Sequence, residues 1–231
     1  MHPTIKAARV AGALYLLLAL APFHLIYIPG VLYVRGNATA TAGNIAAHEL
    51  LLRFGIVSAL ITGVVFMFLG LALYRLLSGV SKSHAAVMVI LVLISAAIGF
   101  VNELNNIAAL MLARGADFLA GLEKPQRDAL AMLFLRLHGQ GNVLNESFWG
   151  LWLFPFGVLV MRSGFIPRIL GAWLILNGFA YLILSFAGLL LPHYHGMLFK
   201  LAFPALLGEL AIMLWLLIKG AKVQPSPAPA G

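Results

Sequence analysis

Long apolar stretches alternate with short polar segments along the chain, and six of the stretches are long enough to cross a membrane. They cover residues 7–28, 50–77, 85–113, 129–161, 169–191 and 198–218. About 20 residues of helix span a hydrocarbon core about 30 Å thick. Backbone amides cannot stay unpaired in lipid, and the stretches lack the alternating period of barrel strands. We therefore predict an all-α fold, a bundle of six transmembrane helices.

The composition agrees with this prediction and limits the number of domains. Of the 231 residues, 62% are hydrophobic and 10% are charged, and the mean hydropathy is +1.01. Little chain lies outside the apolar stretches, so we expect one domain, residues 1–222. Residues 223–231 are rich in proline and alanine and are predicted to form a disordered cytoplasmic tail. The chain has no cysteine, which excludes disulfides, thiolate metal sites and cysteine nucleophiles.

The distribution of lysine and arginine predicts the orientation. If the amino terminus lies inside, the cytoplasmic segments carry no acid and eight bases, Lys6, Arg9, Arg75, Lys82, Arg162, Arg168, Lys219 and Lys222. The positive-inside rule then predicts that both termini are cytoplasmic. Most of the net charge of +8 arises on this face, where anionic lipid headgroups account for it. The expected partner is therefore the lipid bilayer, and nucleic acid is not expected.

Acidic residues inside the apolar stretches are the strongest indication of function. Glu103, Glu146 and Glu209 each lie well within a stretch, and each ionisable residue costs about 2–3 kcal/mol to insert. At about 1.5 Å of rise per residue, Glu103, His138 and Glu209 share a depth of about 13–16 Å from the outer ends of their helices. We therefore expect these three side chains to approach one another around a cavity that opens toward the outer face.

The neighbouring polar residues point into the bundle in the same way. His138 and Asn142 share one helical face, and Glu146 lies at its edge. Asn106 belongs to the polar string NELNN at residues 102–106, which lipid cannot accommodate. Two glycines in HGQGN, residues 138–142, weaken the helix and let other atoms approach its backbone. A kink or a cavity is expected there.

Five segments of the chain together resemble a bacterial membrane family catalogued as domain of unknown function 4386. They are ARVAGALYLL at 8–17, RFGIV at 53–57, FLRLHG at 134–139, RSGFIPRILG at 162–171 and PALLGEL at 204–210. The resemblance covers nearly the whole chain and implies a multi-pass protein of the bacterial cytoplasmic membrane, without an established activity. It adds weight to Arg53, His138 and Glu209, which fall inside the matching segments. The predicted ligand-binding residues are His138, Glu209, Glu103, Asn142, Asn106, Glu146 and Arg53.

Three classes of function remain open. The first is a transporter or sensor whose buried acids hold a proton, or a cationic or hydroxylated small ligand that enters from the external side. The second is an intramembrane enzyme in which His138, Glu103 and Glu209 bind a metal or act as acid and base on a lipid-derived substrate. The third is a structural accessory subunit in which polar residues only join helices. We favour the first.

Cofactor chemistry receives no support from the sequence. The chain has no HExxH motif or other spaced set of metal ligands, so we expect neither a metal nor another cofactor. Glu209 has no positively charged neighbour in the sequence, and a carboxyl group removed from water favours its neutral form. Glu209 is therefore expected to be protonated at neutral pH. The oligomeric state is left open.

Overall fold

The computed structural model describes residues 3–19, 21 and 23–220, and within them every regular element is a helix. The predicted tail, and the last two residues of the predicted domain, lie outside the described residues. The elements are α1 (Pro3–Leu18), η1 (Phe23–Tyr27), α2 (Ile28–Leu32), α3 (Ala38–Ala47), α4 (Glu49–Leu77), α5 (Lys82–Arg114), η2 (Asp117–Leu119), α6 (Lys124–Leu151), α7 (Leu153–Ser163), α8 (Arg168–Leu190), η3 (Pro192–Tyr194) and α9 (His195–Ile218).

Six helical stretches are long and apolar enough to cross a membrane. They are Ile5–Leu32, Glu49–Leu77, Lys82–Arg114, Lys124–Arg162, Arg168–Leu190 and Pro192–Ile218. Each overlaps one of the predicted stretches, which confirms the prediction of an all-α fold with six helices of membrane-spanning length. Large apolar side chains cover the outside of these helices; Leu190, for example, is 77% exposed. Such exposure suits contact with lipid rather than with water.

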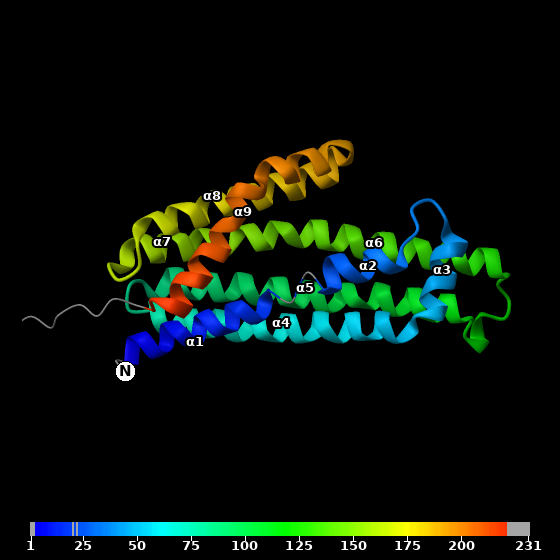
Figure 1. Cartoon of the computed structure of the whole chain (residues 1–231), viewed down its shortest axis with the longest axis horizontal. Coiled ribbons are helices and arrows are strands. Elements are labelled where there is room, and N and C mark those ends of the chain that lie inside the picture. The colour runs from blue at the N-terminus through cyan, green and yellow to red at the C-terminus, as the bar shows by residue number, and fades with distance from the viewer. Residues whose placement is uncertain (1–2, 20, 22, 221–231) are drawn as a thin grey trace, which may run out of the picture.

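The long helices α4, α5 and α6 lie side by side along the molecule (Figure 1). The antiparallel hairpin of α8 and α9 packs on them through α8 and α6, and α9 then runs obliquely to α1 (Figure 1). Arg9 on α1 donates a hydrogen bond to the Ile218 carbonyl at the end of α9, at 3.4 Å. The first and last of the membrane-length helices therefore begin and end at the same face of the bundle.

Two of the predicted helices are interrupted. The first closes at Leu18, where the Ala19 amide bonds to the Leu16 carbonyl at 3.0 Å, and the short π-helix η1 follows. The fourth is interrupted for one residue at Trp152, between α6 and α7, where the backbone keeps right-handed helical angles. Pro155 has no N–H to donate to the carbonyl of Leu151, so a continuous helix would lack a hydrogen bond at this point. Neither interruption was predicted from hydropathy.

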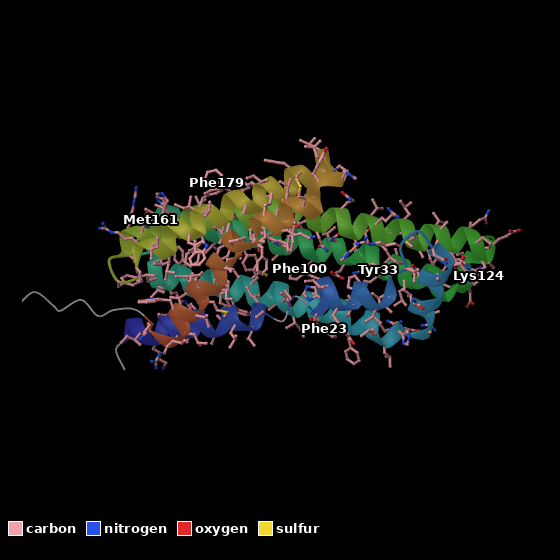
Figure 2. All side chains as sticks on the ribbon, turned by 45° about the horizontal axis from the view of Figure 1, so that its top comes forward. Phe23, Tyr33, Phe100, Lys124, Met161 and Phe179 are labelled. Carbon is pink, nitrogen blue, oxygen red and sulfur yellow. The ribbon has the colours of Figure 1, made fainter. Side chains whose placement is uncertain are left out.

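Two apolar cores occupy the two ends of the bundle. One surrounds Trp152 and Phe156 at the end where α1 begins, and the other surrounds Ile45 and Leu135 at the opposite end. The helices α4 and α5 contribute to both cores and carry small or polar residues between them. Phe100 lies in this middle region (Figure 2). Glu103, Asn142 and Glu209 belong to the layer between the cores.

Candidate intramembrane binding site

Glu103 on α5 accepts hydrogen bonds at both of its carboxylate oxygens. His138 Nε2 on α6 lies 3.0 Å from Glu103 Oε1, and Asn106 Nδ2 donates to Glu103 Oε2 at 2.8 Å. Glu103 is 7% exposed and His138 is 5% exposed. Since an ionised carboxylate only accepts hydrogen bonds, the arrangement fits a Glu103 carboxylate that faces an imidazole N–H. The structure thus brings together three of the residues predicted from the sequence.

Gly141 provides the space in which α5 and α6 exchange hydrogen bonds. A Cβ atom at Gly141 would overlap the side chain of Asn102. In that space Asn102 Nδ2 donates to the His138 carbonyl at 2.9 Å and to Asn142 Oδ1 at 3.0 Å. The glycine therefore permits a close approach, as predicted, although α6 continues without interruption to Leu151.

Glu209 on α9 belongs to a second polar group. The Tyr15 hydroxyl on α1 donates to Glu209 Oε1 at 2.6 Å, and Tyr181 and Asn177 on α8 also interact with the carboxyl group. Side chains of α8 fix this part of α9, because Trp173 Nε1 donates to the Pro204 carbonyl at 3.2 Å and Asn177 Nδ2 donates to the Leu206 carbonyl at 3.4 Å. Side chains of α1 and α8 therefore position Glu209 on α9.

A cavity of about 360 Å³ connects the two polar groups, and Glu103, Asn142 and Glu209 all line it. This volume is at the lower end of the range of about 300–1,000 Å³ that is usual for small-molecule sites. Most of the lining side chains are apolar, and none of the lining residues in the described chain is lysine or arginine. His24 adds an imidazole, whose Nδ1 lies 3.3 Å from Ser58 Oγ. Both helix interruptions border the cavity, through Ala19 and Trp152.

Aromatic residues form a large part of the lining, and of these only Trp149, on the same helical face as His138 and Asn142, was expected from the sequence to point into the bundle. They are Tyr15, Phe66, Phe100, Trp149, Trp152 and Tyr181. The Trp152 ring lies 6.1 Å from the Tyr15 ring and 5.2 Å from the Phe66 ring, and the Trp149 and Tyr181 rings are 5.9 Å apart. The rings thus form two groups, one with Tyr15 and one with Tyr181, and Glu209 contacts both tyrosines. The available signal was a tyrosine hydroxyl inside an apolar helix, which needs a hydrogen-bond partner.

Asn145 on α6 is a further polar residue of the lining. Its Nδ2 donates to the Ser95 carbonyl at 3.1 Å, and Ser95 Oγ donates to Asn145 Oδ1 at 3.0 Å. The two residues line the cavity and satisfy each other across α5 and α6. This pair joins the helices and leaves no polar atom of its own without a partner.

The other predicted residues lie outside the cavity lining. His138 and Asn106 stand behind Glu103. Glu146 Oε2 lies 3.7 Å from His195 Nε2, and neither atom has a hydrogen-bond partner among the described residues. Arg53 is exposed and forms an ion pair of 2.6 Å with Glu49.

Arg114 also contacts the Glu49 carboxylate, at 3.0 Å. The structure therefore does not bring Arg53 or Glu146 together with Glu103 and Glu209. A metal ligand set is also missing from the described ranges, since their histidine, aspartate and glutamate residues form no group of three or more that could hold an ion.

Six helices long and apolar enough to cross a membrane indicate a multi-pass membrane protein, and a cavity lined by Glu103 and Glu209 lies between them. Residues 10–220 match the family described as Domain of unknown function (DUF4386). The chain belongs to this family, as the resemblance of its segments indicated. An uncharacterized protein of Archaeoglobus fulgidus is 32% identical over 80 residues, which are 35% of this chain and 46% of that protein. The chain thus aligns with less than half of that relative. No solved structure matches the chain.

Proposed function

We propose that this protein binds a proton or a small molecule in the cavity between Glu103 and Glu209, in the manner of a transporter or a sensor. The observation that carries the proposal is that acidic residues of α5 and α9 line the same cavity. A carboxyl group that faces an apolar space costs several kcal/mol if it is left charged and unpaired. An exchangeable proton or a bound ligand provides the missing partner.

A purely structural role explains only part of the polar layer. Ser95 and Asn145 satisfy each other and require no ligand. Glu209 lines the same cavity but differs from them, because it is ionisable and its partners Tyr15, Tyr181 and Asn177 are neutral. A residue that only joins helices needs no ionisable group, which is costly inside a membrane. This contrast favours a binding protein over a structural accessory subunit.

The pair of Glu103 and His138 supports an acid/base enzyme as a second candidate. A histidine held 3.0 Å from a carboxylate is the usual arrangement of a general base and the group that orients it. A ligand in the cavity would meet Glu103 first, however, because His138 is not among the lining residues. Because Glu103 lies between His138 and the cavity, a role for His138 in balancing the charge of Glu103 is favoured over direct contact with a ligand.

We further propose that the protein lies in the bacterial cytoplasmic membrane with both termini in the cytoplasm, and that residues 1–222 form one domain. The concentration of lysine and arginine near the start of α1 and the end of α9 supports this orientation. The bacterial family that the sequence resembles supports the location. The proposed partners are the lipid bilayer and the proton or small molecule of the cavity.

Dicyclohexylcarbodiimide provides the test, because this apolar reagent adds to protonated carboxyl groups in places that water does not reach. The full-length protein, purified in detergent, is treated at neutral pH, and the modified residues are mapped by mass spectrometry. We expect label on Glu209 and none on Glu49, which is ion-paired outside the cavity. In the matched control Glu146→Gln, which changes an acid away from the cavity, Glu209 should react as in the wild type. Absence of label on Glu209 would contradict the proposal.

A further inference from the structure

We infer that the ligand of this cavity is a lipophilic organic cation, which displaces a proton from Glu209 and enters from the bilayer between α1 and α9. The inference rests on the proposed function and adds the class of the ligand and its route. Three observations carry it, namely the charge balance of the cavity, its aromatic lining and the position of its mouth.

The charges that face the cavity favour a cation. Glu103 has an imidazole within 3.0 Å that can balance its charge, whereas Tyr15, Tyr181 and Asn177 offer Glu209 only neutral donors. The other ionisable residue of the lining is His24 on η1. A deprotonated Glu209 therefore lacks a positive partner among the described residues, and a charge inside the membrane without one is strongly unfavourable. A cationic ligand supplies this partner, and an anionic ligand would be repelled.

The aromatic lining selects an organic cation over a metal ion. Tyr15 and Tyr181 both contact the Glu209 carboxyl group. The Trp152 ring lies 6.1 Å from the Tyr15 ring, and the Trp149 ring lies 5.9 Å from the Tyr181 ring. Aromatic faces attract ammonium groups within about 6 Å, and sets of such rings recognise quaternary ammonium ligands. The same rings bury the apolar body of the ligand. Amines and quaternary ammonium compounds that carry an apolar group combine the two requirements.

Apolar residues line the cavity where it reaches the surface near α1 and α9. Ala19, just beyond α1, and Leu210 on α9 line the cavity and are also exposed at the surface. The two helices touch tightly on one side of the mouth, where a Cβ atom on Gly12 would meet the backbone of Leu217. Beyond Leu18, α1 ends, while α9 continues toward the tip of its hairpin (Figure 1). A molecule dissolved in the bilayer reaches this opening without crossing a polar surface.

The exchange balances both atoms and charge. The protonated Glu209 carboxyl group releases one proton, the cation binds beside the resulting carboxylate, and the charge of the cavity is unchanged. Protons and the cation therefore exclude each other at this site. Binding of the cation should weaken as the pH falls, by up to about tenfold for each pH unit over the range in which Glu209 titrates.

Protection against dicyclohexylcarbodiimide tests the inference with wild-type protein. The probe is benzyltrimethylammonium, and its control is neopentylbenzene, which has the same shape without the charge. We expect the ammonium compound to slow the labelling of Glu209, with a half-effective concentration that rises as the pH falls, and we expect no protection from the uncharged compound. Trp149→Leu should raise the half-effective concentration by about tenfold, within the range for a lost cation–aromatic contact. Phe179→Leu changes an exposed ring on the outside of α8 and should leave the half-effective concentration unchanged.

The outcomes separate this inference from the proposed function. If Glu209 is labelled and both compounds protect equally, or neither protects, the cavity and its acid stand but the cationic ligand is refuted. If Glu209 is not labelled under any condition, the proposed function fails and the inference fails with it. Protection by the cation alone that does not change with pH would refute the exchange with a proton.

Discussion

Replacing Gly141 with alanine tests the close contact of α5 and α6 that supports Glu103. The new Cβ atom would overlap the Asn102 side chain, which donates to the His138 carbonyl at 2.9 Å and to Asn142 Oδ1 at 3.0 Å. Both hydrogen bonds must be given up when the side chain moves. Hydrogen bonds between helices in membranes contribute about 0.6 kcal/mol on average and up to about 1.7 kcal/mol. The loss of two therefore amounts to about 1–3 kcal/mol.

Gly139→Ala is the matched control, because Gly139 lies in the same helix and has open space where its Cβ would be. Both substitutions gain helix propensity, by up to about 1 kcal/mol, so their difference isolates the hydrogen bonds. We expect Gly141→Ala to be the less stable by about 1–3 kcal/mol in reversible unfolding in mixed detergent micelles. Combining it with Asn102→Ala should cost less than the sum of the two single changes. Equal stabilities of the two glycine variants would refute this reasoning.

Three other predictions follow from the site and the topology. Glu209→Gln should keep the hydrogen bond from Tyr15 and shift the melting temperature by no more than about 2–4 °C, while binding of the ammonium probe, measured by equilibrium dialysis, is lost. Unfolding of this variant would indicate a charged, paired glutamate instead. Arg53→Ala should leave the carbodiimide labelling of Glu209 unchanged, because Arg53 is exposed and far from the cavity lining, and reduced labelling would assign it to the site. A reporter that is active only in the periplasm, fused after Gly231, should be silent, and a strong signal would overturn the orientation.

Hydropathy predicted the membrane-length helices because the thickness of the bilayer sets the length of every apolar stretch that crosses it. Depth and helical face predicted that Glu103, His138 and Glu209 approach one another, because lipid excludes such residues from its side of the bundle. Glu103 and His138 do meet, but Glu209 lies in a separate group around Tyr15 and shares only the cavity with Glu103. These predictions rely on properties of single helices. They succeed where one helix face is sufficient to fix the environment of a residue.

The features that were not predicted from the sequence depend mostly on contacts between distant segments. Tyr15 and its partner Glu209 are 194 positions apart, so no local pattern links them. Glu146 follows Asn145 directly, and the turn of about 100° per residue directs it away from the cavity toward His195. Arg53 belongs to a segment that resembles the family, yet it pairs with Glu49 at the surface. The break at Trp152 depends on a proline within an apolar stretch, which average hydropathy does not register.

Glu209 shares one cavity with the α5 side chains near Glu103, and a variant that fills this cavity shows whether the two acids belong to one site. Gly99 on α5 lines the cavity, and a Cβ atom there would meet only Asn145 Nδ2, at 3.9 Å. In Gly99→Leu the larger side chain should reduce the carbodiimide labelling of Glu209 on α9 severalfold. Gly43→Leu, where the added atoms meet open space, should leave the labelling at the wild-type level. Wild-type labelling in folded Gly99→Leu protein would contradict the shared cavity.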